Sequence, residues 1–253
     1  MNPIAFSVFG MDIRWYGILI GAGILVGLLL VKYTCEIKKL DYDTMLNMIL
    51  IGLPVGIIGA RLYYVAFNWD IYNGDLVQIF NIRGGGLAIH GGLIFGLAAG
   101  LIYAKNQKIS FLEYIDAAVP SIAIAQAMGR WGNFFNSEAH GSSVSYNFIK
   151  HFPKFIQRGM HIDGVYYHPT FLYESSIDLM ISGILILILR KSKHKGTVLF
   201  TYIFLYSLGR FFIESLRTDS LMLGPIKMAQ FISVIGMVIS LVYFAYSYIK
   251  KHH

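Results

Sequence analysis

The chain has 253 residues, of which 56% are hydrophobic and only 14% are charged. Because about a quarter of the residues of a soluble domain are charged, this composition excludes an ordinary soluble protein and indicates an integral membrane protein. The net charge of +7 does not indicate nucleic-acid binding, since the basic residues are not clustered in a soluble domain, and the single cysteine, Cys35, excludes an internal disulfide bond and a multi-cysteine metal site.

Apolar stretches follow one another along the chain, and a bilayer core requires about 20 mostly apolar residues per helix. The stretches at 111–129, 168–189 and 196–214 contain acidic or basic residues toward one end, and the stretch at 44–67 contains Arg61 near its far end. No Lys or Arg precedes Arg14, so we expect a retained first helix and no cleavable signal peptide. The prediction is an all-α integral membrane protein with about seven transmembrane helices, at about 15–31, 44–67, 84–104, 111–129, 168–189, 196–214 and 228–249.

The distribution of Lys and Arg predicts the orientation of these helices. If the N-terminus lies outside, 11 of the 21 basic residues fall in short cytoplasmic segments, and the other 10 are spread over longer outer segments. Short basic loops face the cytoplasm, so we expect an outer N-terminus and a cytoplasmic C-terminus. We expect one polytopic membrane domain over residues 1–253, with a small extracytoplasmic cap at about 131–167.

Ionisable side chains inside a bilayer are energetically costly, so each is a candidate functional residue. In the expected topology they all lie in the outer half of the membrane or at its outer face. One polar cavity, open outward or sideways to lipid, explains this shared depth. The residues concerned are Arg14, Tyr16, Arg61, Arg83, His90, Arg130, His168, Glu174, Arg210, Glu214 and Arg217.

The richest polar stretch is Gly129 to Gly141, with the sequence GRWGNFFNSEAHG. Arg130 offers a fork of donors suited to phosphate oxygens, and Asn133 and Asn136 add neutral donors on one helical face. The alternative is a structural one, namely an interfacial turn with an Arg–Glu pair involving Glu138 and helix-capping asparagines.

A second stretch, Arg83 to Gly92, contains a glycine triplet and then His90 inside an apolar run. A lone histidine on such a face is usually a hydrogen-bonded structural group. The alternative is a general base, because the reference pKa of about 6.5 for histidine suits proton removal near neutral pH.

Two further stretches place acidic and basic groups together near helix ends. In 168–174, sequence HPTFLYE, Glu174 is expected to face the cavity or an arginine. In 209–217, sequence GRFFIESLR, Arg210 and Glu214 are four residues apart on one helical face. They form either a simple charge pair or part of a second anion clamp. The sequence has no serine hydrolase, zinc protease or Walker A motif and no histidine spacing typical of a metal site.

These stretches, in this order, resemble the prolipoprotein diacylglyceryl transferase family. Residues 129–141 match the family signature G-R-x-G-N-F-x-N-x-E-x-x-G at every specified position. The shorter pieces RWYG at 14–17, HGG at 90–92, HPTFLYE at 168–174 and RFFIE at 210–214 also look like family positions. The resemblance covers the chain from Arg14 to the last helix, and the part of the cap at 142–166 carries no matching motif.

The resemblance implies that the diacylglyceryl group of phosphatidylglycerol is transferred to the lipobox cysteine of a prolipoprotein signal peptide, with release of glycerol phosphate. It implies the bacterial cytoplasmic (inner) membrane, an active site toward the outer leaflet, and no metal or nucleotide cofactor. The expected catalytic residues are His90, Arg130 and Arg210. The expected substrate-binding residues are Tyr16, Arg130, Asn133, Asn136, Glu138, Gly141, Glu174, Arg210 and Glu214.

Two other classes remain as alternatives. A membrane transporter of an anionic lipid or small anion also needs intramembrane arginines, but the chain shows no internal repeat. A structural membrane scaffold does not explain the costly charges. A covalent product distinguishes an enzyme from both.

Overall fold

The computed structural model describes residues 1–72, 76–82 and 85–252. The chain divides into two compact units. Unit 1 comprises Met1–Lys38 and Ile115–His253, and unit 2 comprises Lys39–Tyr114. All of the expected site residues except His90 belong to unit 1.

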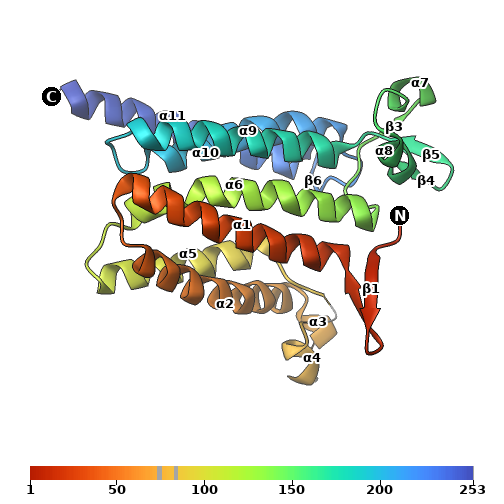
Figure 1. Cartoon of the computed structure of the whole chain (residues 1–253), viewed down its shortest axis with the longest axis horizontal. Helices are drawn as coiled ribbons and strands as arrows, with labels where there is room; N and C mark the ends of the chain where they lie inside the picture. Colours follow the sequence, from red (N-terminus) through yellow and green to blue (C-terminus); the bar gives the residue numbers. More distant parts are fainter. Residues whose placement is uncertain (73–75, 83–84, 253) are drawn as a thin grey trace. The chain divides into compact units, whose positions relative to one another are not determined.

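Unit 1 is built from long helices that run side by side (Figure 1). They are α1 (Trp15–Lys38), α6 (Phe111–Asn136), α9 (Thr170–Lys191), α10 (Thr197–Leu216) and α11 (Met228–His252). The apolar core joins α6, α9 and α10 through Val119, Ala123, Ile181, Leu185, Leu189 and Val198.

Buried polar side chains tie these helices together. Thr34 donates a hydrogen bond to the carbonyl of Ala117 at 2.7 Å, and Ser182 donates to that of Pro120 at 2.8 Å. The carboxylate of Asp116 on α6 accepts hydrogen bonds from backbone N–H groups at the start of α10, those of Gly196 and Leu199. This contact explains an acidic residue inside a predicted span, because the first N–H groups of a helix need acceptors.

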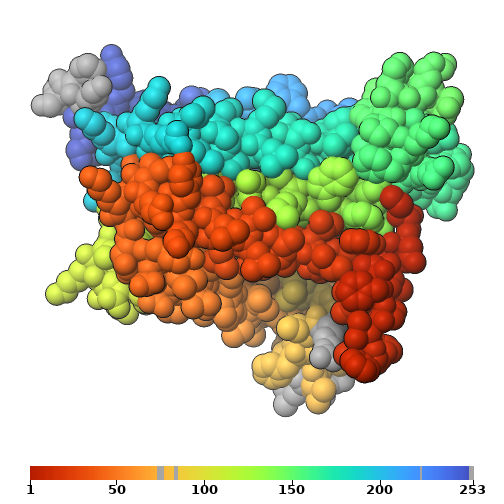
Figure 2. Space-filling model, in the orientation of Figure 1, coloured from red at the N-terminus to blue at the C-terminus, as the bar shows by residue number. Residues whose placement is uncertain are grey.

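The opposite ends of unit 1 differ. The N-terminal hairpin and a small cap lie at one end, and α11 ends at the other (Figure 1). The cap protrudes beyond α9 (Figure 2). The hairpin consists of β1 (Ile4–Val8) and β2 (Met11–Arg14). The cap consists of β3 (Ser143–Val144), α7 (Tyr146–Ile149), α8 (Lys154–Gly159), β4 (His161–Ile162) and β5 (Val165–Tyr167), with the antiparallel strand order β3-β5-β4. A second short hairpin, β6 (Met222–Leu223) and β7 (Ile226–Lys227), connects α10 to α11.

Unit 2 is a closely packed helix pair, α2 (Tyr42–Phe67) and α5 (Ile89–Asn106), with the short helices α3 (Trp69–Tyr72) and α4 (Leu76–Phe80) after α2. Glycines spaced four apart face each other across the pair, Gly52 and Gly56 on α2 and Gly92 and Gly96 on α5. A Cβ atom at Gly56 would lie 3.1 Å from the carbonyl oxygen of Gly92. Small residues thus allow the close backbone approach that stabilises helix pairs in membranes.

Each of the seven expected spans contains a long helix, but the boundaries differ. Among the described residues, five helices are long and apolar enough to cross a membrane: α1, α2, α9, α10 and α11. Polar residues lower the mean hydropathy of the other two, Glu113 and Asp116 in α6 and the terminal Lys105 and Asn106 in α5. Helix α6 continues to Asn136 and does not end at about residue 129, so the first residues of the expected cap, 131–136, are helical. The continuation is stabilised by aromatic packing, because Phe134 is buried against Phe171 and the cap.

Candidate functional site

Glu174 lies at the centre of a charged cluster in unit 1. Its carboxylate is only 5% exposed, near the start of α9. Its Oε2 lies 2.6 Å from Nε of Arg130 on α6, and its Oε1 lies 2.8 Å from a terminal nitrogen of Arg210 on α10. One carboxylate therefore holds two arginines from two other helices.

Three more ion pairs extend this arginine–carboxylate cluster. Arg210 also contacts Glu214, one turn further along α10, at 2.6 Å. Arg217, which follows the end of α10, lies 3.3 Å from Oε1 of Glu174 and donates through Nε and a terminal nitrogen to the two oxygens of Asp219 at 2.9 and 2.7 Å. Such a two-pronged contact fixes the plane of the guanidinium group.

At the centre of the cluster the arginines are more exposed than the carboxylates that hold them. The side chains of Arg130 and Arg210 are 23% and 20% exposed, whereas those of Glu174 and Glu214 are 5% and 2% exposed. Glu174 and Glu214 thus lie beneath the guanidinium groups of Arg130 and Arg210 and hold them in place. An anion can reach these two arginines without first meeting Glu174 or Glu214.

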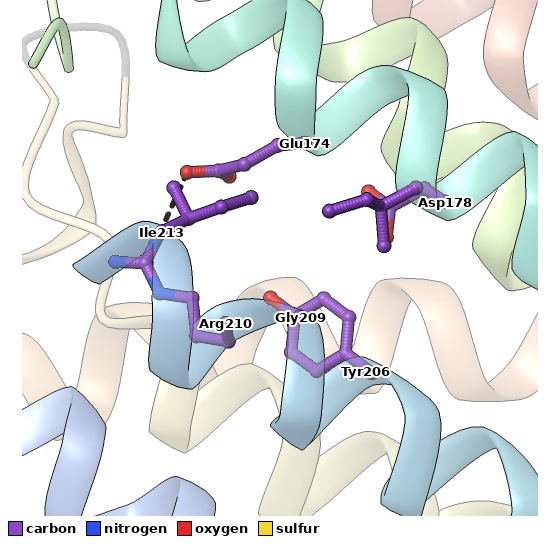
Figure 3. Close-up of a pocket in the computed structure, with 7 residues that line it drawn as sticks. Glu174, Asp178, Tyr206, Gly209, Arg210 and Ile213 are labelled. Carbon is purple, nitrogen blue, oxygen red and sulfur yellow. Dashed lines mark hydrogen bonds and ion pairs between the residues drawn. The ribbon is translucent and has the colours of Figure 1, made fainter. Parts of the chain in front are cut away.

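A small cavity adjoins the cluster between α9 and α10. Figure 3 shows Glu174 and Asp178 on α9 facing Tyr206 and Arg210 on α10. The hydroxyl of Tyr206 accepts a hydrogen bond of 3.4 Å from Arg130, so the tyrosine connects the cavity to the cluster. The other lining residues are Ile177, Gly209 and Ile213.

The end of α6 carries a second polar group. The side-chain amides of Asn133 and Asn136 both donate to Oε1 of Glu138, at 2.9 and 3.2 Å. The chain leaves the helix through Ser137 and Ala139, which have positive φ angles of 54° and 56°. The predicted shared helical face of the two asparagines is confirmed, since one carboxylate oxygen receives both.

Gly141 lies where three segments meet. It forms a β-bridge with Arg217, its N–H donates to the carbonyl of His168 at 3.1 Å, and a Cβ atom would lie 2.6 Å from Cβ of His168. A side chain at this position would separate the segments that carry Arg217 and Glu174. Burial lowers the pKa of the adjacent His168, which favours its neutral form.

Tyr16, the second residue of α1, packs on α6. A Cβ atom at Gly132 would lie 2.5 Å from its ring. Within 129–141, neighbouring side chains therefore approach the backbone closely at Gly132 and Gly141. At Gly129 a Cβ atom would meet only open space within 4 Å among the described residues.

His90 and Arg61 belong to unit 2. His90 is exposed in the first turn of α5, with its ring 6.3 Å from that of Tyr63, and its catalytic role stays a prediction. Arg61 is buried and its guanidinium group is occupied by contacts within the protein. Its nitrogens donate to four backbone carbonyls, and the group lies over the ring of Tyr72. Those carbonyls belong to Gln78, Ile79, Gly85 and Gly86. Arg83 lies outside the described residues.

Sequence reasoning missed three residues of this region: Asp178, Tyr206 and Asp219. Asp178 follows Glu174 by four residues and Tyr206 precedes Arg210 by four, so helical spacing alone would have placed both on the face of the cluster. Asp219 stands two residues after Arg217 in an irregular segment, where no periodicity operates. Within the described part of the chain, no group of three or more His, Cys, Asp or Glu side chains is arranged to hold a metal ion.

Comparison with known proteins identifies the family. The family model for prolipoprotein diacylglyceryl transferase matches residues 3–246. A phosphatidylglycerol–prolipoprotein diacylglyceryl transferase of Clostridium botulinum (strain Langeland) is 59% identical over 251 residues, which cover 99% of this chain and 98% of the relative. Its counterpart in Clostridium kluyveri (strain ATCC 8527) is 56% identical over 246 residues, 97% of this chain and 96% of the relative. The chain therefore belongs to the prolipoprotein diacylglyceryl transferase family.

Proposed function

We infer that this chain transfers the diacylglyceryl group of phosphatidylglycerol to the lipobox cysteine of bacterial prolipoproteins, an early step of lipoprotein maturation. Family membership over nearly the whole chain supports the reaction. The structural observation that carries it is the convergence of Arg130 and Arg210 on Glu174, beside a cavity and within a helix bundle. This family membership does not favour the alternative of a transporter.

The proposed reaction forms one bond and breaks one bond. The cysteine sulfur, as a thiolate, attacks the carbon of the diacylglyceryl group that carries the phosphate. The carbon–oxygen bond breaks, a thioether forms, and glycerol phosphate leaves with the electron pair. The proton lost by the thiol goes to a base and finally to solvent.

Arg130 and Arg210 stabilise the leaving phosphate. Negative charge grows on the phosphate oxygen as the bond to carbon breaks, and fixed positive groups lower the energy of that transition state. Both guanidinium groups are held by buried carboxylates and remain partly exposed. They therefore need little rearrangement to receive the phosphate, with Glu174 and Glu214 acting as orienting residues.

The thiol has to ionise before it attacks, because its reference pKa is about 8.5. A field of arginines favours the thiolate. We propose His90 as the proton acceptor, since it is exposed in the first turn of α5. Near-normal turnover of a His90→Gln variant would remove it from this role.

The remaining predicted residues hold the lipid headgroup. Asn133 and Asn136 are oriented by Glu138 and offer amide donors, and Tyr16 offers a hydroxyl at the start of α1. Gly141 contributes through backbone shape, because it lets the segments of Arg217 and His168 meet.

The proposed setting is the bacterial cytoplasmic (inner) membrane. We propose seven spans in one polytopic domain, with the N-terminus and the cap at about 131–167 outside and the C-terminus in the cytoplasm. The N-terminal amino group donates to Ser137 at the cap end of unit 1, and α11 ends at the opposite end, so the two ends of the chain lie at opposite ends of this unit, as the proposed orientation requires. Both substrates reside in the membrane, so lateral openings between helices toward the outer leaflet would admit them.

The test uses purified protein in detergent with phosphatidylglycerol and a lipobox peptide, followed by mass spectrometry. The expected result is a peptide that gains one diacylglyceryl group while glycerol phosphate is released. Arg130→Ala and Arg210→Ala should lose this product, whereas Arg158→Ala, which changes an exposed arginine of the cap, should keep it. Intact lipid and unmodified peptide with folded protein would contradict the transferase function.

A further inference from the structure

Asp178 is a buried carboxylate that the reaction described above does not use. It lies in α9, one turn beyond Glu174, and is only 2% exposed. An ionisable group inside a membrane-spanning helix is costly and calls for a partner or a function.

One oxygen of this carboxylate has no internal partner. Oδ2 of Asp178 is buried and has no hydrogen-bond partner in the part of the chain that the structure describes. The residue lines the cavity, opposite Tyr206 and Arg210 on α10 (Figure 3). A hydrogen-bond acceptor thus adjoins a space that a ligand group can enter.

The other aspartate inside a predicted span shows what a structural role looks like. Asp116 is 1% exposed, and both of its oxygens accept hydrogen bonds from the first N–H groups of α10, at 2.7 and 2.8 Å. Asp178 lacks such a complement at Oδ2. Because a buried acceptor without a partner is energetically costly, its partner is expected to arrive from outside the chain.

The surroundings limit the chemistry of that partner. The partner has to donate a hydrogen bond, and it has to lie beside the arginines. It also has to be small, because the cavity accommodates a group of about the size of a water molecule. Residues four apart on a helix have Cβ atoms about 5–6 Å apart, so Asp178 lies one helical turn from Glu174, whose carboxylate holds both arginines. In phosphatidylglycerol the headgroup hydroxyls stand on the carbons next to and beyond the one that carries the phosphate, so a phosphate at the arginines leaves a hydroxyl nearby.

We propose that Oδ2 of Asp178 accepts a hydrogen bond from a hydroxyl of the lipid's glycerol headgroup and so selects phosphatidylglycerol among anionic phospholipids. The inference rests on the proposed function. Arg130 and Arg210 recognise the phosphate, which all such lipids share, and Asp178 recognises the hydroxyl, which only some of them carry. A site built around a hydroxyl rejects an analogue without one, because its buried acceptor is then left unpaired.

The experiment compares two lipids as diacylglyceryl donors in the peptide assay. Phosphatidylglycerol carries the hydroxyls, and phosphatidylmethanol keeps the phosphodiester but lacks them. For the wild-type protein we expect kcat/KM to favour phosphatidylglycerol by at least about tenfold, as a hydrogen bond to a charged acceptor implies. In Asp178→Ala this ratio should fall to near one, mainly through the loss of activity with phosphatidylglycerol.

Two further variants keep the test decisive. Asp178→Asn preserves the shape of the side chain but offers a neutral acceptor, so its ratio should lie between those of the wild type and the alanine variant. Asp116→Asn is the matched control, and its lipid ratio should stay at the wild-type value whatever its stability. A wild-type protein that uses both lipids equally, or a folded Asp178 variant that keeps the wild-type ratio, would overturn the role of Asp178 while the transferase function stands. No product from either lipid with the wild-type protein would overturn both.

Discussion

The carboxylate of Glu174 lies 2.6 Å from Nε of Arg130, and the two residues come from helices far apart in the sequence. The same carboxylate holds Arg210 from a third helix. This contact makes one acidic side chain responsible both for fixing the arginines and for neutralising part of their charge inside the bundle. Stability and catalysis are therefore expected to depend on the same residue.

Replacing Glu174 by Gln should destabilise the protein as well as slow it. The partly exposed arginines would lose their shared, buried counter-charge, and breaking a buried ion pair on one side costs on the order of 3 kcal/mol. Thermal unfolding in detergent should show a lower midpoint than for Asp163→Asn, an exposed change in the cap that is expected to be nearly neutral. An unchanged midpoint would mean that the cluster does not hold the helices together.

Replacing Arg130 by Lys tests the geometry of the clamp separately from its charge. Lysine keeps a positive charge but lacks the planar fork that reaches Glu174 and Tyr206 together. Turnover should fall by about 10²–10³, as for the loss of one oriented donor at a transition state. A kcat close to that of the wild type would show that charge alone suffices at this position.

Gly141→Ala should disturb the site without touching a charged residue. The added Cβ atom would lie 2.6 Å from Cβ of His168 and 3.1 Å from the carbonyl oxygen of Leu216, both of which are held by backbone hydrogen bonds. Overpacking of this kind costs about 1–3 kcal/mol, and turnover should fall because Arg217 moves with its bridge to residue 141.

Gly183→Ala provides the control for that experiment. Gly183 lies within α9, and a Cβ atom there would meet nothing within 4 Å among the described residues. Alanine favours a helix over glycine by about 0.5–1 kcal/mol, so this variant should unfold at the same or a higher temperature. Equal losses in both variants would remove the steric explanation for Gly141.

Much of the helical framework could be predicted from the sequence, because apolar stretches of fixed length report the demands of a bilayer directly. The central residues of the charged cluster could be predicted as well, since Arg130, Glu174 and Arg210 are costly wherever they lie in a membrane. Their pairing could not, because it depends on which faces of α6, α9 and α10 meet. The predicted end of α6, at about residue 129, is too early. The helix extends to Asn136 because Phe134 packs against the cap, and the local sequence pattern does not report such tertiary contacts.

The pH dependence of stability should contain a contribution from His168. Burial lowers its pKa in the folded protein, so the unfolded chain binds more protons as the pH falls below the usual value of about 6.5. Stability should therefore be retained above this pH and decrease as the pH falls below about 6.5. In His168→Gln the decrease should be smaller, whereas His151→Gln, an exposed change in the cap, should keep the wild-type profile. Identical profiles for all three proteins would exclude His168 as the source.

Arg61→Ala should loosen unit 2 locally while leaving the arginines of unit 1 intact. Arg61 donates to the carbonyls of Gln78 and Ile79 in α4 and to those of two glycines that precede α5, so its removal takes a charged donor away from four backbone carbonyls. Hydrogen exchange of the backbone amides of α4 should become faster by about tenfold or more, because each lost hydrogen bond to a charged group is worth about 1.5–3 kcal/mol. Arg61→Lys keeps the charge but reaches fewer carbonyls, so its exchange rates should lie between those of the wild type and the alanine variant. Unchanged exchange in the alanine variant would show that other contacts hold α4 in place and that the hydrogen bonds of Arg61 do not stabilise it.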